Sequence, residues 1–201
     1  CTMFCGFRCE YETDINLSGL LANEAGILGG KMHIAMHAFA KIALFFAAGA
    51  ILGASHKKYV SELAGLGRVM PFTFIVFTIG TLSIIGLPFF GGMWSKWYLI
   101  SGGLNFQGPE ATYWAVLIGL TVSSLLNIYY LLSIPMTAFF NKPVKSSTEN
   151  YHAGGHHPVS EGIKEAPLAC LIGMAIPTFI TIYLFFDPQV FYRLSSTLAN
   201  F

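Results

Sequence analysis

Charged residues are scarce in this sequence. Of its 201 residues only 10% are Asp, Glu, Lys or Arg, whereas 54% are hydrophobic. A soluble domain usually carries about 25% charged residues, so a water-facing globular surface is excluded for most of the chain. The formal net charge of +1 also lacks the basic excess that nucleic-acid binding requires. These absences predict a protein whose surroundings are lipid and other membrane proteins.

Cysteines and catalytic motifs are scarce as well. Three of the four cysteines, Cys1, Cys5 and Cys9, form a C-x3-C-x3-C pattern that matches neither common zinc nor iron–sulfur spacings. The histidines of the stretch 141–166 are a second metal candidate, but exposed His-rich loops are usually only solvated. We therefore expect no metal and no cofactor. The sequence contains no nucleotide-binding loop and no Ser/His/Asp set. If an oxidoreductase name applies, we expect it to describe a complex to which the chain belongs and not a reaction of the chain itself.

Long apolar runs are what the sequence has instead. A membrane-spanning helix needs about 20 mostly apolar residues, and four segments reach or approach that length. They are residues 32–54, 70–104, 112–140 and 167–186. The sequence therefore predicts an all-α, polytopic membrane protein with about four transmembrane helices.

The second of these segments is too long for one straight helix. It would extend roughly 50 Å at about 1.5 Å per residue, against a hydrocarbon core of about 30 Å. Its middle contains Gly86, Pro88, Gly91 and Gly92, which interrupt helices or tolerate other backbone conformations. We predict two helical pieces joined by an irregular link. Such broken helices often line transport sites, although a plain proline kink between packed helices is the alternative.

Basic residues in the connections predict the orientation. The stretches 55–70 and 141–166 carry Lys and Arg, whereas 105–111 carries neither. The positive-inside rule places the two basic stretches in the cytoplasm, which requires segment 70–104 to cross once. We divide the chain into an atypical segment 1–14, a transmembrane region 15–140, a polar cytoplasmic loop 141–166, and a last helix with its tail, 167–201.

The first span carries a stripe of titratable residues. His33, His37 and Lys41 recur every four residues, so they lie on one face of a helix. Lysine near mid-membrane costs a few kcal/mol and needs a partner or a water-filled cavity. Histidine exchanges protons near neutral pH, so the stripe is a candidate proton relay. The alternative is that Lys41 extends to an interface and the histidines bond within their helix.

A further lysine, Lys96, follows the break. It stands among Trp94, Trp97 and Tyr98, and such aromatics commonly mark the membrane interface. The residue is therefore either a titratable group beside irregular backbone or an interfacial anchor. No Asp or Glu lies well inside the four apolar segments. A buried lysine usually needs an anionic partner, which we expect from water, another subunit or a part of the protein outside this chain.

Two long strings of the sequence are similar to a known family. HIAMHAFAKIALFFAAGAI resembles the histidine–lysine helix of the antiporter-like subunits of respiratory complex I, Mrp-type sodium/proton antiporters and membrane-bound hydrogenases. GLGRVMPFTFIVFTIGTLSIIGLPFFGGMWSKWYLI resembles their late discontinuous helix. Together the strings cover about residues 19–104. The runs SKWYLI and HAFAK look most similar to the D-type member of the Mrp antiporters.

The resemblance implies a fold and a role for each residue. The family has about fourteen helices with two inverted repeats of five, each repeat holding a broken helix and a half-channel, and this chain would be its C-terminal part. Lys41 matches the central lysine, His33 and His37 the relay histidines, and Lys96 the terminal titratable residue. The implied partners are other membrane subunits, protons and, in antiporters, Na⁺. The implied location is a prokaryotic plasma membrane.

The segment 1–14 departs from the family, which has an apolar helix there. We interpret it as the mark of a truncated gene whose reading frame shifts before about Ile15. Three hypotheses follow: a proton-translocating or antiport subunit, a structural subunit of a redox complex without its own ion path, and a non-functional gene fragment.

Overall fold

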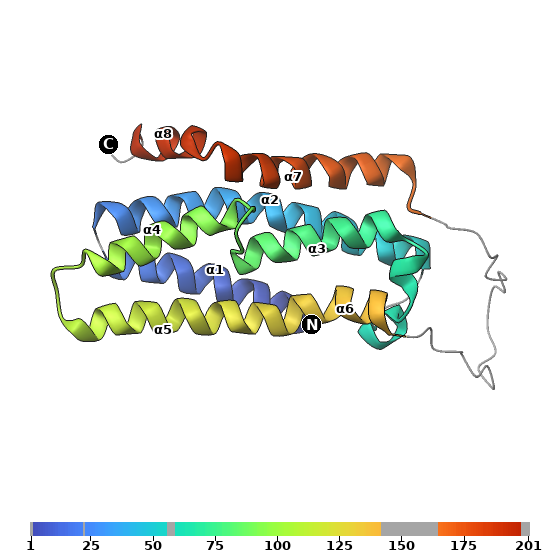
Figure 1. The fold of residues 1–201 in the computed structure, drawn as a ribbon, viewed down its shortest axis with the longest axis horizontal. Helices are drawn as coiled ribbons and strands as arrows, with labels where there is room; N and C mark the ends of the chain where they lie inside the picture. The colour runs from blue at the N-terminus through green and yellow to red at the C-terminus, as the bar shows by residue number, and fades with distance from the viewer. Residues whose placement is uncertain (1, 22, 56–58, 142–164, 198–201) are drawn as a thin grey trace.

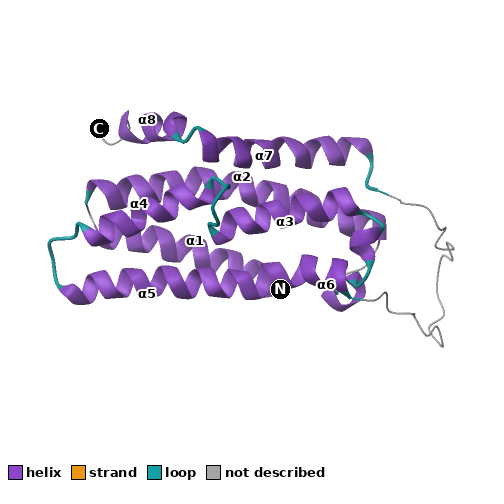
Figure 2. Ribbon diagram, viewed as in Figure 1, coloured by secondary structure: helices purple, strands orange, loops and turns teal. Residues whose placement is uncertain are grey.

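The computed structural model describes residues 2–21, 23–55, 59–141 and 165–197. All regular structure in these ranges is helical, as Figure 2 shows. The helices are α1 (Thr2–Leu21), α2 (Glu24–Ser55), α3 (Pro71–Ile85), α4 (Gly92–Leu104), α5 (Glu110–Asn127), α6 (Ser133–Phe140), α7 (Leu168–Phe186) and α8 (Gln189–Thr197). Short turns at Val60–Leu63 and Leu66–Arg68 precede α3, and a π-helical turn at Ile128–Leu132 joins α5 to α6. The all-α prediction is confirmed.

Helix α2 is the centre of the bundle. It packs against α1, α3, α4, α7 and α8, and Figure 1 shows these helices running along one long axis. Its sequence is rich in Ala and Gly with no proline, so it supports a long helix with a narrow profile that neighbours can approach closely. Because α2 is enclosed on several sides, its polar side chains must find partners within the bundle.

The segment 70–104 forms one interrupted span. Helices α3 and α4 follow one another along the bundle, joined by the irregular residues 86–91 (Figure 1). The helix does not merely bend at Pro88: α3 ends at Ile85, and the capping residue Gly86 has a φ of 84°, in the left-handed region. Glycine adopts that conformation without a steric penalty. The prediction of two helical pieces is therefore confirmed, and the plain kink is wrong.

Within the described residues, three helical stretches are long and apolar enough to cross a membrane by length and composition: Glu24–Ser55, Glu110–Phe140 and Leu168–Phe186. Together α3 and α4 supply the interrupted fourth. The observed bounds lie close to the predicted ones, except that α2 begins at Glu24 rather than near residue 32. The C-terminal ends of α2 and α6 lie at the same end of the bundle in Figure 1. This arrangement is required if residues 70–104 cross the membrane once. The cytoplasmic assignment of that end stays a prediction.

Two predicted features fall partly outside the described residues. The polar loop 141–166 is described only at its edges, where Glu165 accepts hydrogen bonds from Phe72 N at 2.8 Å and Thr73 Oγ1 at 2.9 Å. A carboxylate at this position caps the N-terminus of α3, where unpaired N–H groups and the helix dipole favour negative charge. Residues 2–14 belong to α1, and that helix continues to Leu21 without a break at residue 14; Cys1 lies outside the described residues.

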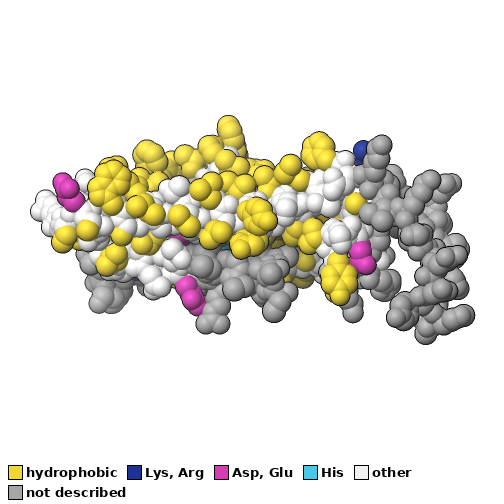
Figure 3. All heavy atoms as spheres, turned by 90° about the horizontal axis from the view of Figure 1, so that it is seen from below, with side chains coloured by type: hydrophobic (Ala, Val, Ile, Leu, Met, Phe, Trp, Pro, Cys, Tyr) yellow, Lys and Arg dark blue, Asp and Glu magenta, His cyan; other side chains and the backbone are white. Residues whose placement is uncertain are grey.

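Hydrophobic side chains cover the outside of the bundle. Figure 3 shows them along the whole length of the face seen from below, with charged side chains at its two ends and on one edge. On α5 alone, Trp114, Ile118 and Leu125 are each more than half exposed. Contiguous apolar surface of this extent marks contact with lipid or with other proteins, as expected for a membrane span.

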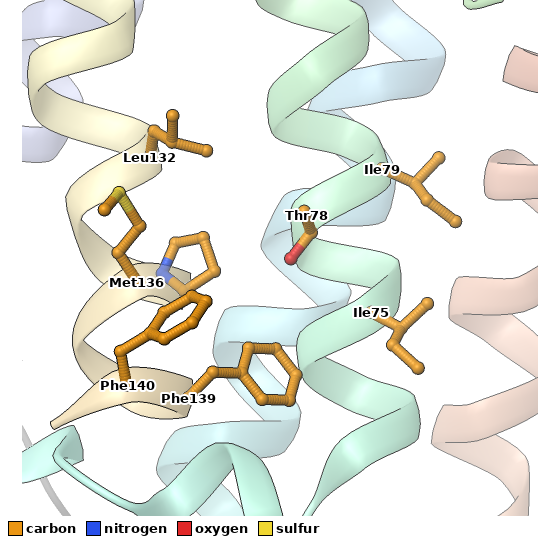
Figure 4. A pocket seen from close by; sticks show the side chains of 8 residues that line it. Ile75, Thr78, Ile79, Leu132, Met136, Phe139 and Phe140 are labelled. Carbon is orange, nitrogen blue, oxygen red and sulfur yellow. The ribbon is translucent and has the colours of Figure 1, made fainter. Parts of the chain in front are cut away.

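A groove of about 300 Å³ opens on this outer surface between α3 and α6. Figure 4 shows Ile75 and Ile79 of α3 on one side and Met136 and Phe140 on the other. Its lining contains no titratable side chain; Thr78 is its single polar residue, and its hydroxyl donates to Phe74 O within α3. The groove therefore suits hydrocarbon and is separate from the titratable residues.

Candidate functional site

Titratable side chains meet in the interior of the bundle, around the middle of α2. His33 and His37 are only 3% and 4% exposed. Their rings stack with centroids 4.9 Å apart, because residues four apart lie above one another on a helix. The predicted stripe therefore faces inward and is continuous from one ring to the next.

Lys41 stands one turn further along the same face of α2. It is half-buried and close enough to act electrostatically on both histidines. The structure thus brings together the three residues of the predicted stripe. The stripe turns toward α1 and α4 at its His33 end.

The helix break is held by close backbone contacts. Gly91 N donates a hydrogen bond to Thr181 O of α7 at 3.0 Å. At Gly92 an added Cβ would collide with the carbonyl oxygen of Ser83, so only glycine lets α4 start this close to the last turn of α3. Phe89 adopts a φ of 78° without being glycine, a conformation that is strained for a side chain of this size. Pro88 lies exposed in the same link.

Lys96 bonds to a backbone carbonyl that the helix break leaves without a helical partner. It is 8% exposed, and its Nζ donates to Ile85 O at 3.1 Å and to Ser124 Oγ at 2.9 Å. Ile85 is the last residue of α3, so its carbonyl has no helical partner. A side chain at Gly86 would meet Lys96 Cδ at 2.8 Å, so this glycine also makes room for the lysine. Lys96 is therefore a buried group of the bundle, which favours the titratable-group interpretation over the interfacial anchor.

Ser95 connects the broken helix to the histidines. Its Oγ donates to Gly92 O at 2.9 Å and lies 3.2 Å from His33 Nδ1. A hydroxyl has one proton to donate, so in this arrangement it accepts a hydrogen bond from Nδ1–H of His33. This contact links α2 to α4 one residue away from Lys96.

A carboxylate lies in the same cluster. Asp14 of α1 is fully buried, and its Oδ2 is 3.5 Å from His33 Nδ1. Lys96 is close enough to interact with it electrostatically. The prediction that this chain provides no anionic partner at depth is wrong: a buried carboxylate comes from the segment before the first apolar run.

Sequence reasoning missed Asp14, Ser95 and Ser124. A signal for Asp14 does exist, since Asp14, Ser18 and Leu21 recur at helical spacing and all three are buried. The two serines carry no such signal, because their importance comes from contacts to residues 62 and 28 positions away.

The described residues contain no group of three or more His, Cys, Asp or Glu side chains arranged to hold a metal ion. Cys1 and the histidine-rich part of the 141–166 stretch lie outside those residues, and the side chains of Cys5 and Cys9 are likewise not described. The polar cluster is a set of titratable side chains, namely Asp14, His33, His37, Lys41 and Lys96, with Ser95 beside His33 and Ser124 bonded to Lys96.

Comparison with known proteins places this arrangement in a family. Residues 15–126 match the family model described as NADH:quinone oxidoreductase/Mrp antiporter, TM. The match contains all the site residues predicted from the sequence. It begins one residue after Asp14.

Curated relatives agree with this match. The chain is 32% identical over 171 residues to NADH-quinone oxidoreductase subunit L of Neisseria meningitidis serogroup A, covering 79% of this chain and 25% of that subunit. NADH-quinone oxidoreductase subunit N of Desulforudis audaxviator is 31% identical over 160 residues, with 80% and 30% covered. NADH-ubiquinone oxidoreductase chain 5 of Cryptococcus neoformans is 31% identical over 153 residues, with 75% and 21% covered. The chain thus spans between a fifth and a third of the length of these relatives.

Solved structures show the same fold. A chain of the Mrp complex from Dietzia sp. DQ12-45-1b superposes with a TM-score of 0.69 at 22% identity, covering 88% of this chain and 38% of that one. A chain of respiratory complex I from Thermus thermophilus superposes with a TM-score of 0.53 at 18% identity, covering 94% and 44%. Together with the family match, these likenesses show that the chain belongs to the antiporter-like family of membrane subunits that complex I and Mrp share.

Proposed function

We propose that this chain translocates protons through the buried row formed by Lys96, His33, His37 and Lys41. The observation that carries the proposal is the continuity of the row. The two histidine rings stack, Lys96 is adjacent to Ser95, and Ser95 contacts His33. Proton transfer requires donor and acceptor groups within hydrogen-bond reach of one another, directly or through one water. The contact between Ser95 and His33 has that distance, and we propose that water molecules complete the other steps of the row.

The cost of the row supports a functional role. Charged groups inside a membrane-spanning bundle are expensive and are usually replaced by apolar residues unless they are used. The broken helix adds a strained residue at Phe89 and, at Ile85, a carbonyl without a helical partner. Irregular backbone at membrane depth is tolerated where it lines a transport site or is satisfied by protein. Here the satisfying group is itself the titratable Lys96.

The finer assignments rest on the family. We propose that the partners are other membrane subunits, since relatives and structural neighbours are parts of complexes named Mrp and complex I. The assignment to the D type of Mrp antiporter, with Na⁺ exchanged for protons, rests on the runs SKWYLI and HAFAK. A prokaryotic plasma membrane is the proposed location, and redox reactions or Na⁺ exchange elsewhere in the complex would drive the protons.

Replacing Lys41 tests the proposal. In inverted vesicles from cells that express the complete complex, we expect Lys41→Ala to reduce proton flux, followed with a fluorescent pH probe, by on the order of 100-fold, the scale of a lost acid–base group. Lys31→Ala is the matched control, because Lys31 lies on the same helix ten residues earlier and outside the row. Its flux should equal that of the unmodified protein.

The structural hypothesis predicts a different result. If the chain only holds a complex together, Lys41→Ala leaves proton flux intact, and only loss of the helices prevents assembly. Normal flux in Lys41→Ala vesicles, with the complex present at its usual level, would overturn the proton-path assignment.

A further inference from the structure

We propose that Asp14 is an additional proton-binding residue of the row, acting as the partner of His33. The inference rests on the proposed function, because it adds a carboxyl group to the same path. Its observation is separate: a fully buried carboxylate from α1 lies 3.5 Å from a ring nitrogen of α2. Residues 14 and 33 are brought together by the packing of α1 against α2.

The burial of Asp14 argues for an exchangeable proton. Neither carboxyl oxygen has a hydrogen-bond partner among the described residues, apart from the charge contact to His33. A permanently ionised carboxylate needs several hydrogen bonds to balance the loss of water. A carboxyl group that exchanges its proton with His33, and is ionised only with the charge of Lys96 or of the protonated ring beside it, carries less of that cost.

The ring of His33 has the geometry for transfer. Its Nδ1 lies 3.2 Å from Ser95 Oγ and 3.5 Å from Asp14 Oδ2, while Nε2 has no hydrogen-bond partner among the described residues. When Nε2 takes up a proton while Asp14 is ionised, the N–H bond at Nδ1 can break and its proton pass to Oδ2. The products are a neutral ring and a neutral carboxyl group, so the proton and the charge balance.

Among the described side chains, the charged groups near Asp14 come from helices that pack against α1. The π-helical turn Ile128–Leu132 also contacts α1, and it carries Tyr129 and Tyr130 but no charged residue. Helix α2 supplies His33, and α4 supplies Lys96. On its own helix Glu12 is exposed to the outside. Helix α5 carries its only carboxylate, Glu110, in its first turn, while the part beside α4 presents Ser124 to Lys96. Lys96 is therefore the cation whose charge Asp14 balances when ionised, and His33 is its proton donor.

Infrared spectroscopy of labelled aspartate tests the proposal directly. The chain contains two aspartates, Asp14 and Asp187, and Asp187 lies at the end of α7, where Tyr183 Oη contacts it at 3.2 Å. With ¹³C-aspartate in the full chain in lipid nanodiscs, we expect a carboxylic-acid C=O band that appears and disappears between about pH 4 and pH 9. Asp14→Asn should abolish this band, whereas Asp187→Asn should leave it.

Proton flux in vesicles of the complete complex supplies the second measurement. We expect Asp14→Asn to lower flux on the order of ten-fold or more, and Asp14→Glu to restore most of it, because a carboxyl group is again present. Asp187→Asn should not change flux. An unchanged flux in Asp14→Asn, or a labelled band that is absent across the pH range, overturns the assignment.

The two proposals fail separately. If Lys41→Ala vesicles transport normally while the Asp14 band titrates and Asp14→Asn loses flux, the row as drawn is wrong but Asp14 still binds a transported proton. If Lys41 and Lys96 are needed for flux and Asp14 has neither signal, the row stands and Asp14 is only a structural neighbour of His33.

Discussion

The two halves of α2 have opposite characters. From Ala40 to Ile51 its buried face is Ala, Leu and Ile, and it packs against Phe74 and Phe77 of α3 in one apolar cluster. From Gly29 to His37 the buried face is glycine, methionine and histidine, and it contacts α1 and α4. Glycine at position 29 lets the backbone of Leu99 approach so closely that a Cβ would lie 2.8 Å from its nitrogen.

The difference separates stability from chemistry along a single helix. The apolar half maximises packing between side chains, the main source of association inside a membrane. The other half gives up that packing for two histidines, which lie beside Asp14 of α1 and Ser95 of α4, and burying such polar groups is costly. We infer that the apolar face from Ala40 to Ile51 holds α2 in place, while the two histidines, with Lys41 at the boundary on the other face, carry protons. Three substitutions test this division.

The largest loss of stability is expected at Phe74. This side chain is fully buried in the apolar cluster, so Phe74→Ala leaves a cavity and should lower the free energy of unfolding by about 3 kcal/mol. Phe72→Ala, at a half-exposed position of the same helix, is the control. Thermal unfolding in detergent measures both.

The comparison adds a second readout for Phe74→Ala. Flux per correctly assembled complex should stay close to normal, because no group of the row is changed. A flux that falls as far as in Lys41→Ala would mean that the apolar half takes part in transport, and the division between the halves would be wrong.

An intermediate effect is expected at the break. Gly92→Ala places a methyl group against the Ser83 carbonyl, and relieving this overlap should cost about 1–3 kcal/mol. The relief moves α4 away from α3 and so lengthens the contact between Lys96 and Ile85 O. We therefore expect reduced flux together with reduced stability.

Gly49→Ala is the matched control for this change. A Cβ at Gly49 of α2 meets no other atom within 4 Å, so the substitution should be neutral or slightly stabilising, as alanine favours helix. Equal behaviour of the two variants would show that the close approach at Gly92 is unimportant.

The smallest effect on stability is expected at Ser95. Ser95→Ala removes the hydroxyl between His33 Nδ1 and Gly92 O, a change worth about 1 kcal/mol. Flux should fall several-fold nevertheless, because the link from α4 to the histidines is lost. Ser101→Ala, further along α4, serves as the control. Equal proton flux in the Ser95→Ala and Ser101→Ala variants would remove Ser95 from the row.

Much of the fold follows from local sequence patterns. The length of the apolar runs indicated the spans, and Gly86, Pro88 and Gly92 indicated the break, because each residue limits the backbone regardless of its neighbours. The spacing of His33, His37 and Lys41 indicated a shared face for the same reason. These features depend on residues close together in the chain, so the sequence is enough to predict them.

The partners of those residues depend on packing between distant segments. The sequence alone determined that this chain is a helical membrane protein with one broken span and a titratable stripe. Only the tertiary structure decided that Lys96 bonds to Ile85 O and Ser124, that Ser95 contacts His33, and that Asp14 is the carboxylate beside them. The reason is physical: a helix defines which side chains share a face, whereas the choice of neighbour depends on how several helices fit together at once.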